Sequence, residues 1–90
     1  MIVQILYRPD SEHARVLEEY ARDFAGRSSA KKVLLVSLST REGYNLASLY
    51  DIVRYPAVLV TTDIGGFVKS WQGTDEVPPT VNELMGYVNS

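Results

Sequence analysis

Four short runs of aliphatic and aromatic residues alternate along the chain with segments in which apolar residues recur every three or four positions. The runs cover residues 2–7, 33–38, 57–62 and 67–72. Runs of this length, rich in β-branched residues, predict strands. The first two have apolar residues at successive positions, which is typical of strands buried on both faces. We therefore expect 33–38 to be a buried strand like 2–7.

The first periodic segment follows Pro9 and runs to Gly26. Asp10 or Ser11 is expected to cap its N-terminus, with Glu12 in the first turn, where a carboxylate favours the helix dipole. The apolar residues on its predicted buried face are Val16, Leu17, Tyr20, Ala21 and Phe24. Their spacing predicts an amphipathic helix that ends at Gly26.

Two further helices are predicted from capping patterns. Ser39 with Glu42, and Thr80 with Glu83, each have the spacing of a capping box. The apolar residues expected on one face behind the first pair are Tyr44, Ala47, Leu49 or Tyr50, and Val53. Those behind the second pair are Val81, Leu84, Met85 and Val88. Both segments are therefore predicted to be short helices, each with one buried face.

The lengths of the connections indicate the topology. A strand, helix and strand joined by the polar segment 27–32 predict a parallel right-handed crossover, and the short glycine turn at 63–66 predicts an antiparallel hairpin. We predict one domain, residues 1–90, of the α/β class. Its order is β-α-β-α-β-β-α, on one mixed four-stranded sheet flanked by helices on both faces. The strand 67–72 is expected at the sheet edge, with Phe67 and Trp71 buried under the last helix.

Composition excludes several classes of function. The 90 residues hold 9 Lys and Arg against 11 Asp and Glu, a net charge of -2, so the basic face that nucleic acid requires is not expected. Cysteine is absent, which excludes thiol nucleophiles, disulfides and thiolate metal sites. His13 is the only histidine, and we predict no metal site and no cofactor.

The N-terminal sequence predicts a cytoplasmic protein. Met1 leads directly into an apolar run that has no basic segment before it and is too short for the core of a signal peptide. No apolar stretch approaches the roughly 20 residues that cross a bilayer, so no membrane partner is expected.

The most informative stretch of the chain is YDIVRYPAVLV, residues 50–60. It resembles the thioredoxin and glutaredoxin superfamily, in which a helix ends in a Tyr-x-Ile segment and a cis proline follows four residues after the Ile. Tyr50, Ile52 and Pro56 match this pattern. The resemblance extends over essentially the whole chain and implies a thioredoxin-like fold.

The same resemblance aligns Ser11 and Ala14 with the two active-site cysteines of the family. Ser11-Glu12-His13-Ala14 therefore stands where the family has Cys-x-x-Cys. Dithiol exchange needs one thiolate to attack and a second thiol to resolve the mixed disulfide. We expect a redox-inactive member of the superfamily that is not a thiol-disulfide oxidoreductase and has no catalytic residues.

The resemblance also implies a binding site. In the family, the residue before the cis proline offers its backbone N–H and C=O to an extended peptide, and Tyr55 has that position here. The residues expected to form the binding face are Tyr7, Arg8, Ser11, His13, Tyr55 and Pro56. The predicted function is a module that binds a protein or an extended peptide.

Two other classes of function stay open. One is a structural or assembly subunit, including a homodimer formed through the edge strand 67–72, where Lys69 would oppose pairing. The other is a non-thiol enzyme with Arg8, Ser11, His13 and Asp75 in one pocket. It is the least favoured, because Ser11 and His13 point to different faces of a helix and no third group orients the imidazole. The simpler interpretation is that Ser11 caps the helix and His13 is exposed in its first turn.

Overall fold

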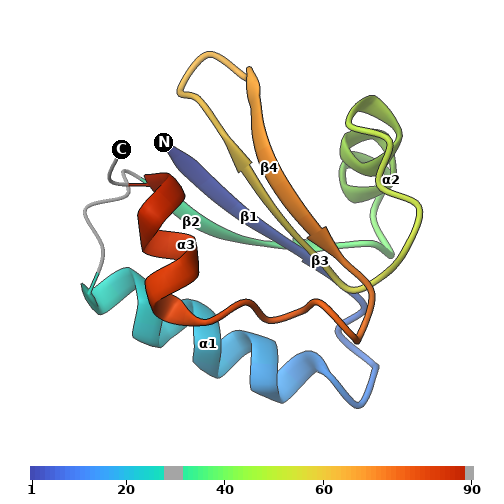
Figure 1. Cartoon of the computed structure of the whole chain (residues 1–90). Coiled ribbons are helices and arrows are strands. Elements are labelled where there is room, and N and C mark those ends of the chain that lie inside the picture. The colour runs from blue at the N-terminus through green and yellow to red at the C-terminus, as the bar shows by residue number, and fades with distance from the viewer. Residues whose placement is uncertain (28–31, 89–90) are drawn as a thin grey trace.

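A computed structural model of the chain describes residues 1–27 and 32–88. In these two ranges the elements are β1 (Ile2–Tyr7), α1 (Ala14–Arg27), β2 (Lys32–Ser37), α2 (Arg41–Leu49), β3 (Ala57–Thr61), β4 (Phe67–Gln72) and α3 (Val81–Val88). They form a small α/β fold around a mixed, open sheet (Figure 1). The predicted order of strands and helices is confirmed. Most of the predicted polar connection between α1 and β2 lies outside the described residues.

The sheet has the strand order β2-β1-β3-β4. β1 pairs with β2 in parallel, from Ile2 opposite Lys32 to Tyr7 opposite Ser37, as expected for a strand-helix-strand crossover. β3 pairs with β1 and with β4, antiparallel in both cases. The predictions of a parallel crossover, an antiparallel hairpin and an edge position for β4 are therefore confirmed.

The prediction that the second strand is buried is wrong. β2 forms the other edge of the sheet, and the side chains of Leu34 and Leu35 are 40% and 43% exposed. An edge strand has a neighbouring strand on one side only, so its side chains have fewer contacts than those of a central strand. Its aliphatic sequence gives no sign of this difference, because apolar runs are equally typical of central strands.

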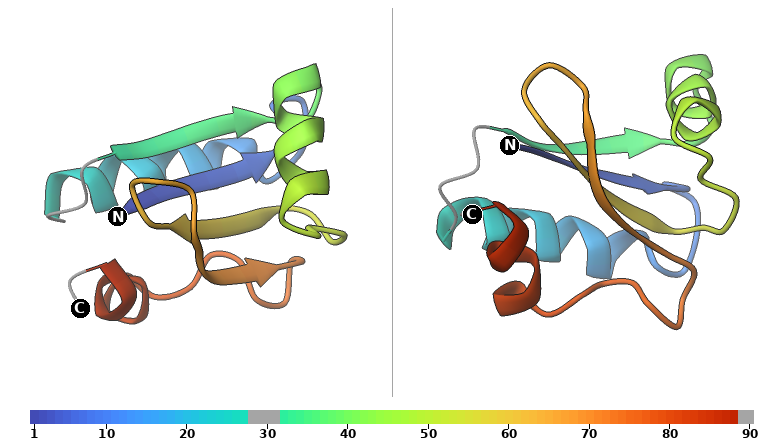
Figure 2. Two further views of the ribbon diagram at one scale, coloured as in Figure 1. Left: turned by 90° about the horizontal axis from the view of Figure 1, so that it is seen from above. Right: turned by 45° about the horizontal axis from the view of Figure 1, so that its top comes forward.

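Two apolar clusters hold the elements together. The larger draws on β1, β3, β4, α1 and α3 and includes Ile5 and Val58, whereas the smaller includes Leu6 and Leu59 together with Ala47 of α2. Neighbouring residues of one strand thus belong to different clusters, since successive side chains point to opposite faces. α1 and α3 lie near each other, and α2 stands at the other end of the molecule (Figures 1 and 2).

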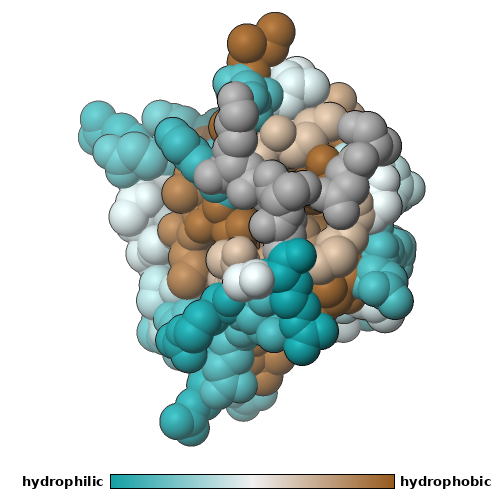
Figure 3. Space-filling view, turned by 90° about the vertical axis from the view of Figure 1, so that its left-hand side faces the viewer, coloured by the Kyte–Doolittle hydropathy of each residue, from teal (hydrophilic) through white to brown (hydrophobic). Residues whose placement is uncertain are grey.

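Not every large apolar side chain belongs to these clusters. At the end of the molecule where β1 begins and α3 ends, hydrophobic side chains reach the surface between hydrophilic ones (Figure 3). Ile64, in the turn between β3 and β4, is 95% exposed. Single exposed apolar side chains of this kind are common on soluble folds and by themselves indicate no partner.

α1 begins at Ala14, two or three residues later than a cap at Ser11 or Asp10 predicts. The N–H and the hydroxyl of Ser11 both donate to the carbonyl of Arg8, at 3.0 and 2.7 Å, and the first helical acceptor is the carbonyl of His13. Neither Asp10 nor Ser11 therefore caps the helix, and Glu12 precedes its first turn. The Ser11 side chain is hydrogen-bonded within the turn at residues 8–11 and therefore does not cap the helix.

The buried face of α1 also differs in one position from the prediction. Leu17, Ala21 and Phe24 are buried as expected, but Val16 is 56% exposed and Ala14 is buried instead. The helix continues one residue past Gly26. Val16 and Leu17 are adjacent apolar residues, so the periodic pattern fits a buried face that includes Val16 as well as one that does not.

α2 has a different cap and a different buried face from those predicted. Thr40, not Ser39, is the N-cap, and its hydroxyl oxygen accepts the N–H of Gly43 at 3.0 Å. A Cβ built on Gly43 would lie 2.0 Å from the Ser37 carbonyl oxygen, so the helix touches β2 through this glycine. Of the predicted face, Ala47 is buried and Tyr50 is partly buried, whereas Tyr44, Leu49 and Val53 are exposed.

The C-terminal part follows the prediction more closely. Leu84 and Val88 are buried, and the Thr80 hydroxyl accepts the N–H of Glu83 at 3.1 Å. The Glu83 carboxylate completes no capping box and instead accepts the indole N–H of Trp71 at 3.0 Å. Trp71 is buried as predicted, but Phe67 is 57% exposed.

An irregularity in the pairing of β3 with β4 explains why Phe67 is exposed. The pairing of β3 with β4 shifts register between Val60 and Thr61. Such a bulge breaks the two-residue alternation of side chains. Phe67 therefore faces Leu49 and Tyr50 at the end of α2, and does not share the buried surroundings of Trp71.

Candidate functional site

A cavity of about 220 Å³ lies where β1 ends and β3 begins. It is lined by Arg8, Ser11, His13, Tyr55 and Pro56. The sheet explains this arrangement, because Leu6 of β1 pairs with Ala57 of β3, and the residues that follow one strand thus lie beside those that precede the other. Five of the six residues expected to form a binding face are brought together.

Tyr7 is the sixth predicted residue, and it does not line the cavity. As the last residue of β1 it is buried, and its hydroxyl donates to the Glu18 carboxylate at 3.0 Å. Burial raises the pKa of Tyr7, and the hydrogen bond and negative charge of Glu18 raise it further. Tyr7 therefore anchors α1 to β1 from beneath the cavity.

The four residues that align with the Cys-x-x-Cys motif point in different directions. Ser11 and His13 line the cavity, Glu12 is exposed, and Ala14 is buried at the start of α1. His13 is exposed as predicted, but it precedes the helix and its carbonyl accepts the first helical hydrogen bond. The motif thus presents one hydroxyl and one imidazole to the cavity.

Tyr55 stands at the rim of the cavity, in the loop between α2 and β3. Its peptide bond to Pro56 is cis, as the resemblance implied. Its side chain is 41% exposed, and its hydroxyl donates to the Ile52 carbonyl at 3.2 Å. Within the described residues, neither the N–H nor the C=O of Tyr55 forms a hydrogen bond. An unpaired donor and an unpaired acceptor therefore lie beside each other at the cavity.

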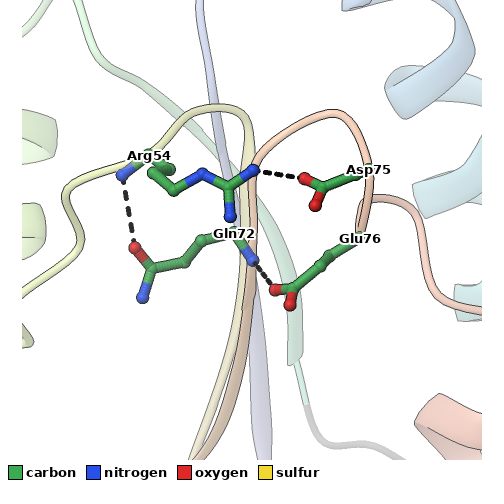
Figure 4. Close-up of polar contacts among 4 residues, drawn as sticks. All are labelled: Arg54, Gln72, Asp75 and Glu76. Carbon is green, nitrogen blue, oxygen red and sulfur yellow. Dashed lines mark hydrogen bonds and ion pairs between the residues drawn. The ribbon is translucent and has the colours of Figure 1, made fainter.

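A polar network holds this loop against the connection that follows β4 (Figure 4). The side-chain oxygen of Gln72 accepts the N–H of Val53 at 2.9 Å and that of Arg54 at 3.2 Å. The Arg54 guanidinium pairs with Asp75, and the N–H of Gln72 donates to Glu76 at 2.8 Å. The backbone N–H groups of the two residues before Tyr55 are thereby satisfied, while the N–H and C=O of Tyr55 itself are left open.

The sequence analysis missed this network. The only local sign was Gly73, which ends β4 with a φ of +88° and allows the chain to turn back. Its N–H donates to the Pro56 carbonyl at 2.9 Å, which joins the turn to the start of β3. Contacts between residues about 20 positions apart cannot be inferred from side-chain type alone.

The catalytic grouping considered from the sequence is not formed. Asp75 pairs with Arg54 and does not line the cavity with Arg8, Ser11 and His13. The Ser11 hydroxyl donates to the Arg8 carbonyl, so its proton is not directed at the imidazole. A serine nucleophile needs a base as its hydrogen-bond acceptor.

The charge of the cavity comes from its basic residues. Arg8 is exposed and forms no ion pair with any described residue. No carboxylate is among the lining residues. A guanidinium, an imidazole, a phenol and an open backbone edge are therefore available to a ligand at one place.

Other kinds of site were sought across the described ranges. Residues 1–27 and 32–88 contain no group of three or more side chains of His, Cys, Asp or Glu placed to hold a metal ion. In the same ranges, no helix is both long enough and apolar enough to span a membrane. No protein-family model and no curated protein sequence matches this chain.

Proposed function

We propose that this chain is a thioredoxin-like protein without redox chemistry, and that it binds an extended peptide segment of a protein partner. The site is the Tyr55-Pro56 loop with the residues that lead into α1. One observation carries the proposal: the backbone N–H and C=O of Tyr55 are both unpaired within the described residues, beside the cavity lined by Arg8 and His13.

The proposed fold family is supported by topology. The order β-α-β-α-β-β-α on one mixed four-stranded sheet agrees with the thioredoxin-like fold that the resemblance implies. Helices on both faces of the sheet are part of this proposal. The division of the core supports them, because α1 and α3 contribute to one apolar cluster and α2 to the other.

The proposed binding mode is strand addition at a single residue. An extended peptide offers a C=O and an N–H in the same spacing as a neighbouring strand, and these match the N–H and C=O of Tyr55. The adjacent cavity of about 220 Å³ accepts a side chain of the peptide. Backbone hydrogen bonds supply affinity in this mode, and the pocket supplies preference for certain side chains.

The proposal requires no sulfur chemistry. The 90 residues contain no cysteine, so neither attack on a disulfide nor its resolution is available to them. The site instead resembles the anchor points of protein interfaces, where an aromatic residue and an arginine contribute most of the binding energy.

The test is selection of peptides from a random display library on the immobilised protein, followed by NMR titration of the ¹⁵N-labelled chain with the enriched peptides. We expect the Tyr55 amide to shift most, together with those of Arg8 and His13. Tyr55→Asp and Arg8→Glu should weaken binding at least about tenfold, as expected for anchor residues.

Phe67→Asp is the matched control, because Phe67 is another exposed aromatic residue that lies outside this cavity. It should leave peptide affinity unchanged, and circular dichroism should show that all three variants are folded. Enrichment of no peptide would refute the proposed site. So would peptides that leave the Tyr55 amide unshifted and bind both Tyr55→Asp and Arg8→Glu as well as the wild type.

A further inference from the structure

The two edges of the sheet are protected to different degrees. At the β4 edge, Lys69 lies in the middle of the strand and the ladder is interrupted by a register shift. A charged side chain and a bulge are both features that prevent edge strands from pairing with other chains. β2 has neither: its register with β1 is unbroken over six residue pairs, and the only charge in the strand is at its first residue, Lys32.

The hydrogen-bonding groups at the outer side of β2 can be assigned from its pairing. The Leu38 N–H donates to the Tyr7 carbonyl, and Tyr7 is in register with Ser37. In a parallel ladder these bonds recur at every second residue, so the N–H and C=O of Val33 and Leu35 point away from β1. In the described part of the chain, no strand pairs with this edge.

The side chains at this edge are apolar on both faces of the sheet. Leu34 and Leu35, which point to opposite faces, are 40% and 43% exposed. A cavity of about 360 Å³ lies between β2 and α1, and its lining includes Val33, Leu35, Glu18 and Arg22. It is open to the side chains of a strand placed next to β2.

We propose that β2 is a dimerisation edge, at which a second copy of this chain pairs its own β2 in antiparallel orientation. Pairing around Leu35 would bring the outward N–H and C=O of Leu35 opposite those of Leu35 in the second copy. The two sheets would then form one continuous sheet. This interface is independent of the peptide site, since it shares no residue with the cavity at Tyr55.

A second copy is favoured over other partners by the charges on α1. Glu18 and Arg22 lie one helical turn apart at the rim of the cavity beside β2. A two-fold axis at β2 places the two α1 helices side by side in opposite directions, so Glu18 of each copy faces Arg22 of the other. Arg22 has no ion pair with a described residue that would compete. Glu18 accepts the Tyr7 hydroxyl through Oε2, which leaves its other carboxylate oxygen for the second copy. Self-complementary surfaces of this kind are what a symmetric dimer requires.

The first experiment measures the oligomeric state of the full chain by sedimentation velocity over a concentration series that reaches the millimolar range. We expect a monomer-dimer equilibrium. Leu35→Lys should raise its dissociation constant at least about tenfold, because it places a charge at the centre of the strand pair. Phe67→Lys, an equivalent change at an exposed residue of the β4 edge, should leave the constant unchanged.

A second experiment avoids changing the strand. Arg22→Glu and Glu18→Arg should each weaken the homodimer, because each brings like charges together across the axis. An equimolar mixture of the two variants should form a heterodimer more tightly than either variant self-associates, since both facing pairs are then of opposite charge. Thermal unfolding of each variant checks that the fold is retained.

Three outcomes would overturn the proposal. The first is a wild-type chain that is monomeric at every concentration. The second is a dimer that is retained by Leu35→Lys and lost in Phe67→Lys. The third is a mixture of Arg22→Glu and Glu18→Arg that shows no preference for the heterodimer.

Discussion

The side-chain oxygen of Gln72 lies 2.9 Å from the backbone nitrogen of Val53 and accepts its hydrogen bond. The same oxygen accepts the N–H of Arg54 at 3.2 Å, so the last residue of β4 supplies the acceptor for two successive amides of the loop before Pro56. A side chain thus replaces the partner strand that this segment lacks, and it determines where Tyr55 stands.

Replacing Gln72 with Ala should therefore lower the free energy of unfolding by about 1–2 kcal/mol, because two backbone donors lose their acceptor. Urea denaturation followed by circular dichroism measures this loss. Ser70→Ala is the matched control on the same strand, since Ser70 only accepts a longer, 3.3 Å bond from the Gln72 side chain. It should change stability by less than about 0.5 kcal/mol. Equal losses in both variants would contradict this role of Gln72.

Gly73→Ala should destabilise the protein by about 1–2 kcal/mol, because a φ of +88° is strained for any residue with a Cβ. The added methyl group would also lie 2.3 Å from Nη2 of Arg54 and displace the guanidinium from Asp75. Gly26→Ala is the control: no atom of a described residue lies within 4 Å of its Cβ position, and alanine is the better helix former. In urea denaturation, Gly26→Ala should be neutral or stabilising, and a similar loss in both variants would argue against backbone strain at Gly73.

Gly43→Ala should lower the free energy of unfolding, although alanine is normally favoured over glycine inside a helix. The new Cβ would meet the Ser37 carbonyl oxygen at 2.0 Å, and backbone cannot yield as a side chain can. We expect a loss of about 1–3 kcal/mol, in the range of overpacked cores, although alanine favours helices. Gly86 in α3 is the control, because no atom of a described residue lies within 4 Å of its Cβ position. Gly86→Ala should therefore show only the gain in helix propensity. If Gly43→Ala proved as stable as wild type in urea, α2 would not contact β2 as described.

Tyr20 predicts a pH dependence of stability. Its pKa is raised, first by burial and then by the negative charge of Glu83. A phenol whose folded pKa exceeds its unfolded value of about 10 contributes stability that is complete below pH 10 and is lost as the pH rises through the folded value. The free energy of unfolding should therefore decline above about pH 10. Tyr7, whose pKa is also raised, adds to this decline.

Tyr20→Phe should make that decline smaller, as measured by urea denaturation between neutral pH and the highest pH at which the chain is folded. At neutral pH the variant should differ from wild type by less than about 1 kcal/mol, because the Tyr20 hydroxyl is buried and has no hydrogen-bond partner in the described residues. An unchanged alkaline decline in Tyr20→Phe would show that this phenol does not titrate differently in the folded and unfolded states.

The candidate site shows where reasoning from sequence succeeds. Comparing residues 50–60 with a known pattern drew attention to Tyr55 and Pro56, and the pairing of β1 with β3 in the structure explains why Arg8, Ser11 and His13 lie beside them. Tyr7 was expected at the same surface but is buried. The alternation of a strand predicts which way its residues point only when the exact end of the strand is known.

Local patterns in the sequence were enough to predict the kinds of elements and their order. Apolar runs of strand length, helical periodicity and glycine turns are local signals, and each reports on residues that are close along the chain. All seven predicted elements are present in the described residues. The absence of cysteine, which rules out thiol chemistry in these 90 residues, is likewise a fact of composition.

Which sides of those elements are buried could not be predicted in the same way, because burial depends on how the elements pack together. β2 is as aliphatic as β1, yet it lies at the edge of the sheet, and the close contact of Gly43 with Ser37 turns Tyr44 of α2 toward solvent. The two backbone amides before Tyr55 are likewise paired by the side chain of Gln72, a residue far along the chain. Burial and pairing depend on neighbours brought together by folding, and the free energy of those contacts exceeds the small local preferences by which a sequence is interpreted.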